Sequence, residues 1–144
     1  MNGVTRLYTP ELLGLAVRLA DYPFDDTLER HGSTRSPSCG STLDLGLTLD
    51  PQGRIARIGM RVHACAVGQA AAAIFADAAI GQDPAALLVA GDTIEQWLGG
   101  QAALPDWPGI AAIEPAHAFP ARHGAMLLPW RAAAQALSNY DSHR

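Results

Sequence analysis

Two cysteines are the residues best suited to chemistry in this 144-residue chain. Cys39 lies in the segment SPSCGS, and Cys65 lies in HACAVGQAAAAIFADAAIG, residues 63–81. Cysteine thiolates bind zinc and iron, and they also act as nucleophiles. The small apolar residues after Cys65 predict a helix from 66 to about 80, and the unpaired N–H groups at a helix N-terminus favour a thiolate. Metal ligation and thiol chemistry are therefore the candidate functions of these residues.

The elements around the cysteines predict that they meet at one end of a sheet. Residues 43–49 alternate between leucine and mostly polar residues, and residues 55–62 form a second predicted strand after a turn, which together predict an antiparallel hairpin. Cys39 precedes the first strand and Cys65 follows the second. Since those two ends are neighbours in a hairpin, we expect sulfur atoms on the order of 3.5–4 Å apart, within reach of one ion. The alternative is that both cysteines are small buried apolar residues.

The rest of the chain predicts an α+β fold in which several helices pack on one face of a small antiparallel sheet of about three strands. Before the hairpin, the sequence predicts a helix over 10–22, capped by Thr9 and ended by Pro23, and a loop over 24–42 with a short edge strand near 28–32. After residue 80, it predicts a helix over 84–90 and a second helix that begins with the capping box Asp92-Thr93-Ile94-Glu95 and ends at Gly99-Gly100. A last helix over 120–140 kinks or restarts at Pro129.

Length and composition predict one globular domain spanning 1–144, because 49% of the residues are apolar. The formal net charge of −4 and the absence of a dense basic block argue against nucleic acid as a partner. No apolar run is long enough to span a bilayer, and the N-terminus does not have the pattern of a secretory signal. We therefore expect a cytoplasmic protein with reduced cysteines and no membrane partner.

Nearly the whole chain resembles the iron–sulfur cluster assembly scaffolds of the NifU N-terminal, IscU and SufU type. The resemblance is carried by the PSCGS loop, the two strands, the small-residue helix after Cys65 and the segment RHGAMLLPW, residues 122–130. It implies the same α+β fold and a site where three cysteines hold a nascent [2Fe–2S] cluster, or zinc in some members. It also implies a cysteine desulfurase and iron–sulfur acceptor proteins as partners.

Carried onto this sequence, the resemblance assigns Cys39 and Cys65 to the first two ligand positions. The third cysteine position is Gly124, and the acidic residue usual two positions after the first cysteine is Ser41. His123 is the nearest substitute donor, and some family members also carry histidine there. Imidazole suits both iron and zinc. The resemblance thus implies a metal site of Cys39, Cys65 and His123, with Ser41, water or the second subunit of a homodimer as a fourth donor.

Three functions follow as alternatives. The first is a non-enzymatic scaffold that holds iron, a [2Fe–2S] cluster or zinc. The second is a cluster-free relative that binds the assembly machinery, which the residues at Gly124 and Ser41 favour. The third is a thiol protein that accepts and passes sulfur through Cys65, with His63 or His123 as the base.

Overall fold

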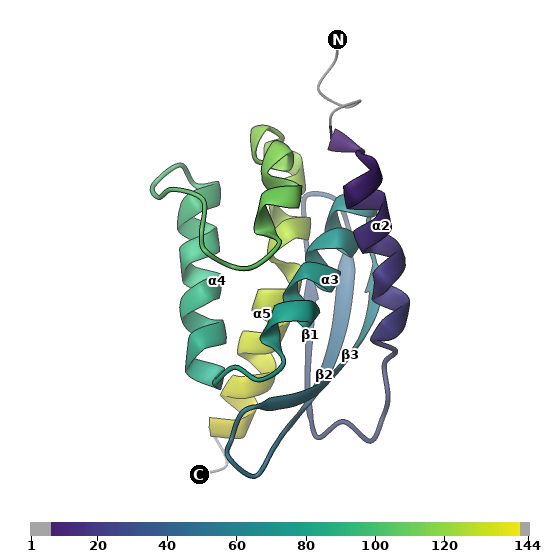
Figure 1. The fold of residues 1–144 in the computed structure, drawn as a ribbon, viewed down its shortest axis with the longest axis vertical. Coiled ribbons are helices and arrows are strands. Elements are labelled where there is room, and N and C mark those ends of the chain that lie inside the picture. The colour runs from purple at the N-terminus through teal and green to yellow at the C-terminus, as the bar shows by residue number, and fades with distance from the viewer. Residues whose placement is uncertain (1–6, 142–144) are drawn as a thin grey trace.

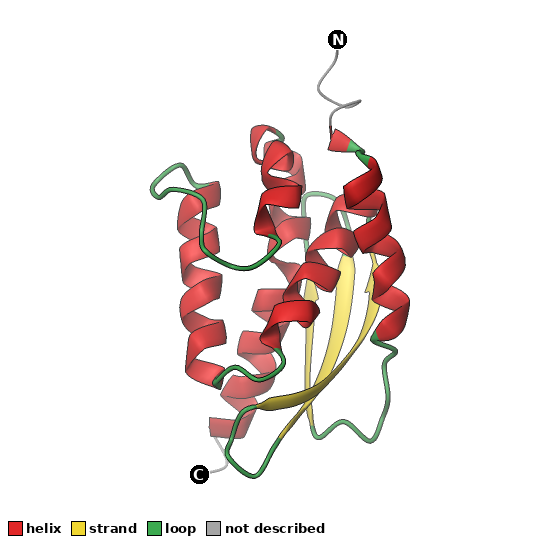
Figure 2. Cartoon of the chain, viewed as in Figure 1, coloured by secondary structure: helices red, strands yellow, loops and turns green. Residues whose placement is uncertain are grey.

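The computed structural model describes residues 7–141, in which helices pack on one face of a three-stranded antiparallel sheet (Figure 1 and Figure 2). The strands lie in the order β1-β2-β3 and span Arg30–Arg35, Thr42–Leu49 and Ile55–His63. The helical elements are α2 (Pro10–Arg18), η1 (Leu19–Asp21), α3 (Ala66–Ala79), α4 (Pro84–Leu98), η2 (Ile110–Ala118), η3 (Pro120–Arg122) and α5 (His123–Asp141). α3 and α5 contact the sheet, while α2 packs on α3 and α4 packs on α5. This arrangement confirms the predicted α+β class.

The hairpin of β2 and β3 follows the predicted alternation. Leu43, Leu45 and Leu47 are 0% exposed on the face beneath the helices, and Met60 lies opposite Leu45 in the register. Burial of each leucine side chain contributes on the order of 1.5–3 kcal/mol. The hairpin therefore joins the sheet to the helical layer and fixes where its two ends lie.

The face of the sheet that carries no helices is crossed by the loop between η1 and β1. A Cβ atom on Gly59 would lie 2.3 Å from the carbonyl oxygen of Pro23, and one on Gly46 would lie 2.8 Å from Leu28. Leu28 is 3% exposed. The two glycines thus allow the loop to lie directly on the strands. The predicted edge strand near 28–32 is displaced toward the C-terminus, because β1 spans residues 30–35 and pairs with residues 42–47 of β2.

The prediction of two helices over 84–98 is wrong, because α4 continues through Asp92 without a break. The sequence Asp92-Thr93-Ile94-Glu95 has the form of a capping box but lies inside the helix. Gly91 leaves room for the neighbouring helix, since a Cβ there would lie 3.3 Å from the Cβ of Trp130. α4 thus packs on α5 along this stretch, and Asp92 is an interior helix residue and not an N-cap.

The final helix α5 runs through Pro129 as one element, which excludes the alternative of a new helix starting there. Its Trp130 is 2% exposed and makes edge-on ring contacts with Phe75 at 5.6 Å and Trp107 at 5.3 Å. These contacts hold the helix in register across the proline. Among residues 7–141, no helix is both long and apolar enough to cross a membrane.

Candidate thiol and metal site

The two cysteines flank the same end of the β2–β3 hairpin. Thr42, the first residue of β2, lies opposite His63, the last residue of β3. Cys39 comes three residues before that pair and Cys65 two residues after it, so both belong to the loops at one end of the sheet, the upper end in Figure 1. Cys65 is the N-cap residue of α3 and is half-buried, whereas Cys39 is exposed. The backbone thus follows the predicted topology, and metal binding by the two sulfur atoms stays a prediction.

A closed turn over residues 36–41 holds Cys39. The amide of Ser36 donates to the carbonyl of Ser41 at 2.8 Å, and the amide of Gly40 donates to the carbonyl of Ser36 at 2.8 Å. Gly40 has a φ of 72°, a left-handed conformation that glycine adopts at little cost. The turn places the Cys39 sulfur beside two hydroxyl groups.

Those hydroxyl groups lower the pKa of the Cys39 thiol. Its Sγ lies 3.4 Å from Ser36 Oγ and 3.0 Å from Ser41 Oγ. Hydrogen bonding with Ser36 and then with Ser41 is the main cause of the lowered pKa. The positive charge of Arg122 lowers the pKa further, and partial burial opposes these effects. Both hydroxyls can donate to a sulfur anion, which favours the thiolate. Cys39 is therefore placed for thiolate chemistry.

The third ligand position of the resemblance is blocked as well as empty. A Cβ atom on Gly124 would lie 2.2 Å from Ser36 Oγ and 3.1 Å from Ser36 Cβ. Ser36 is 1% exposed, and its hydroxyl lies 3.2 Å from that of Ser38, which donates to the carbonyl of Ala121 at 3.4 Å. The Ser36 hydroxyl thus occupies the space that a side chain at position 124 would enter.

His123, the proposed third donor, is held by its neighbours. Its Nε2 lies 2.8 Å from the carbonyl oxygen of His117, and the two imidazole rings are 5.6 Å apart. His117 in turn bonds the carbonyl of Trp97 through its own Nε2 at 2.8 Å. These contacts tie the start of α5 to η2 and α4. The Nδ1 atom of His123 makes no hydrogen bond with any described residue, so a metal would bind there or displace the carbonyl.

Among the side chains that the structure describes, no three from histidine, cysteine or acidic residues are gathered where they could jointly hold a metal ion. The donor set does not reproduce a three-thiolate site, because the third position is Gly124 beside Ser36. Sequence reasoning missed Ser36, Ser38 and Arg122. Ser36 and Ser38 precede Cys39 in SPSCGS, and Arg122 precedes His123. This proximity in sequence was the available signal, but only the folded chain shows which atoms they contact.

Solved structures share this fold, whereas no protein-family model and no curated protein matches the chain. A nitrogen-fixing NifU-like protein (N-terminal) from Brucella abortus matches with a TM-score of 0.90 and 23% identity, over 99% of this chain and 100% of its own. A putative iron–sulfur cluster assembly scaffold protein for the SUF system from the thermophile Fervidobacterium islandicum AW-1 matches with a TM-score of 0.82 and 20% identity, over 92% of this chain and 97% of its own. A hypothetical protein matches with a TM-score of 0.71 and 22% identity, over 88% and 96%.

These likenesses define the class of protein by its fold. The chain has the α+β fold of NifU-like N-terminal and SufU proteins, which confirms the resemblance and the fold class predicted from the sequence. Identities of 20–23% show the fold and not the chemistry. The function therefore has to be argued from the residues at the end of the sheet.

Proposed function

We propose that this protein is a scaffold-type component of iron–sulfur cluster assembly, with Cys39 and Cys65 as the thiolates that hold its cargo. The observation that supports this most directly is the position of both cysteines at one end of the β2–β3 hairpin, in a fold matched over 99% of the chain by a NifU-like protein. Iron or a [2Fe–2S] cluster is the cargo, and zinc is the alternative ion. Cysteine desulfurase and iron–sulfur acceptor proteins are the proposed partners.

Because position 124 is glycine, the proposed site lacks a third thiolate ligand and needs other donors. His123 and Ser41 are the proposed additional donors to Cys39 and Cys65. Because the described cysteine and histidine side chains are not gathered as a metal site, His123 would have to move toward the thiols and use its Nδ1 or give up the carbonyl of His117. A site with two thiolates is weaker than one with three, because thiolate is the stronger donor for iron–sulfur clusters. Cargo held by such a site is expected to be released readily, unless a second subunit completes the ligand set.

The test is anaerobic reconstitution of the full chain with iron and sulfide, followed by visible spectra and assays of bound iron, acid-labile sulfide and zinc. Cys39→Ser and Cys65→Ser should each abolish iron binding, and His123→Ala should weaken it. His31→Ala is a matched control, because this exposed histidine lies on β1 and contacts Phe24. Absence of bound iron and zinc under these conditions would contradict the scaffold proposal and favour the cluster-free partner.

The contacts of Cys39 favour sulfur acceptance as a second candidate function. In that reaction the thiolate of Cys39 attacks the outer sulfur of a persulfide on the desulfurase. A new S–S bond forms on Cys39, the old S–S bond breaks, and the desulfurase cysteine leaves as a thiolate. The sequence pointed to Cys65 for this role, whereas the exposed Cys39 beside two hydroxyl groups is the better placed residue.

Mass spectrometry after incubation with a cysteine desulfurase and cysteine distinguishes the two thiols. An added mass of one sulfur atom should appear in Cys65→Ser and be absent from Cys39→Ser. The reverse pattern would return the role to Cys65. Sulfur on neither variant would rule this candidate out.

A further inference from the structure

The outer edge of β3 is covered at two places and open between them. Near one end, the amide of Met60 donates to the carbonyl of Tyr22 at 2.8 Å, and Pro23 forms a parallel bridge with Met60. At the other end, the amide of Ile55 donates to the carbonyl of Gln82 at 3.0 Å, and the carbonyl of Ile55 accepts from the amide of Gly81 at 2.7 Å. Between Ile55 and Met60 lie residues 56–59, of which residues 56–58 line the cavity described next.

The register determines which way the backbone of Ile58 points. In an antiparallel ladder, residues alternate between those bonded to the partner strand and those whose N–H and C=O point away from it. Met60 points away from β2, because its amide binds Tyr22. Ile58, two residues earlier and opposite Leu47, therefore also points its N–H and C=O to the outer edge. Within residues 7–141, no partner occupies that side of Ile58.

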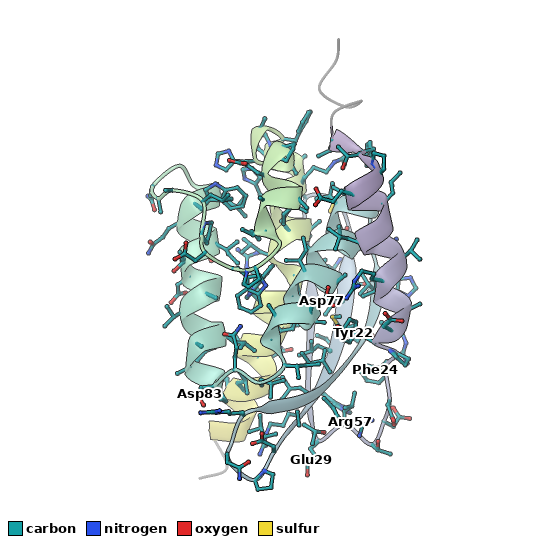
Figure 3. All side chains as sticks on the ribbon, in the orientation of Figure 1. Tyr22, Phe24, Glu29, Arg57, Asp77 and Asp83 are labelled. Carbon is teal, nitrogen blue, oxygen red and sulfur yellow. The ribbon has the colours of Figure 1, made fainter. Side chains whose placement is uncertain are left out.

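A cavity of about 610 Å³ lies against this open stretch. Residues 56–58 of β3, the loop of residues 21–28 and Ile80 at the end of α3 line it. Figure 1 and Figure 2 show the loop bowing away from the lower half of β3, on the side where Figure 3 labels Tyr22, Phe24 and Arg57. Tyr22 and Phe24 give the cavity an aromatic wall. The guanidinium carbon of Arg61 lies 4.5 Å from the centre of the Phe24 ring and helps to hold that ring in place. The cavity thus combines an unpaired strand edge with an apolar wall.

The charge around the cavity is negative. Its lining contains Asp21, Asp25 and Asp26 but only one basic residue, Arg57. Arg57 is neutralised by Asp25, whose Oδ2 lies 3.2 Å from its Nη2. Asp26 is exposed and makes no ion pair with a described residue. A ligand that occupies this cavity is therefore favoured if it is cationic.

We propose that the slot between the two closures of β3 binds an extended, lysine- or arginine-containing segment of a partner protein by strand addition. The backbone groups of Ile58 provide the pairing, and Asp21 and Asp26 attract the basic side chains. Short pairing of this kind exploits a sheet edge that would otherwise stay open. The slot lies at the opposite end of β3 from the cysteines, so the inference does not depend on the proposed function.

The probe is the peptide acetyl-Lys-Val-Lys-Val-Lys-amide, titrated into isotopically labelled protein and followed through backbone amide resonances. Shifts centred on residues 56–58 and protection of the Ile58 amide from hydrogen exchange are expected. The same peptide N-methylated at every residue keeps its charge but loses its backbone donors, and it should not bind. A peptide with glutamate in place of lysine should not bind either.

Variants test the role of charge. Asp21→Asn with Asp26→Asn should weaken binding roughly three- to tenfold, as expected for two exposed ion pairs. Asp92→Asn is the matched control, because this exposed aspartate lies on α4 away from the slot. The proposal is overturned if no shifts occur at residues 56–58, if the N-methylated or acidic peptide binds equally well, or if Asp92→Asn weakens binding as much as the double variant.

Discussion

The hydroxyl of Ser36 and the missing side chain of Gly124 fit one another. A Cβ at position 124 would lie 2.2 Å from Ser36 Oγ, so the Ser36 hydroxyl can keep its position only if residue 124 is glycine. Ser36 is also within 3.4 Å of the Cys39 sulfur. The absence of a third cysteine is thus linked to the hydroxyl groups that surround the first.

This relationship predicts that Gly124→Cys alone is destabilising. The variant should lose about 1–3 kcal/mol of unfolding free energy through overpacking. Ser36→Gly with Gly124→Cys removes both close contacts and should recover stability beyond the sum of the single changes, as measured by urea unfolding in a double-mutant cycle. Additive effects would show that the two positions do not interact.

The same double variant should hold more iron after anaerobic reconstitution than the parent does. It places a third thiol at the position where the resemblance puts one, without the clash. Ser36→Gly alone serves as the control for changes in the loop. A folded double variant that gains no iron would show that the end of the sheet has lost its metal role.

The reactivity of Cys39 is predicted to depend on two specific hydroxyl groups. Since hydrogen bonding with Ser36 and Ser41 lowers the pKa of the thiol, removal of either hydroxyl should raise that pKa and slow alkylation near neutral pH. The measurement is the rate of iodoacetamide alkylation against pH in a Cys65→Ser background. Ser38→Ala is the matched control, because Ser38 binds Ser36 and Ala121 but not the sulfur. Equal effects of all three serines would contradict this assignment.

The hydroxyl of Tyr22 is predicted to lose its proton at a higher pH than an ordinary tyrosine. Burial first, and then its hydrogen bond to Asp77, raise its pKa to about 12. Because the pKa of Tyr22 is raised in the folded state, its protonated hydroxyl contributes fully to the free energy of unfolding below the unfolded pKa of about 10. This contribution is lost as pH rises toward 12. Ultraviolet titration should show one late tyrosine that disappears in Tyr22→Phe and shifts to lower pH in Asp77→Asn. No change in Asp77→Asn would leave burial as the sole cause.

Gly32 on β1 is predicted to be essential for the packing of α5. A Cβ there would lie 2.1 Å from the carbonyl oxygen of Ala132 and 2.9 Å from the amide nitrogen of Ala136, both in the helix backbone. Gly32→Ala should therefore cost about 3 kcal/mol of unfolding free energy. Gly14→Ala in α2 is the control, because its Cβ meets nothing within 4 Å, and it should add about 0.5–1 kcal/mol. Equal stability of the two variants would contradict close packing at Gly32.

Much of the fold could be predicted because its signals are local. The alternation of Leu43, Leu45 and Leu47 sets one face of β2, and Thr9 caps α2 through a hydrogen bond from the amide of Leu12 to its Oγ1 at 3.1 Å. Gly81, with a φ of 91°, follows the C-cap of α3, so the helix ends close to the predicted residue 80. The same local reading placed both cysteines at one end of the hairpin.

The sequence by itself also determined which donors the candidate site can contain, since Cys39 and Cys65 are the only cysteines and position 124 carries no side chain. The tertiary structure alone decided what surrounds them. Ser36 meets Gly124, and α4 runs through an apparent capping box, because segments distant in sequence pack against each other. Local propensities of a few tenths of a kcal/mol are outweighed by burial of side chains worth about 1.5–3 kcal/mol each, and such contacts do not appear in local sequence patterns.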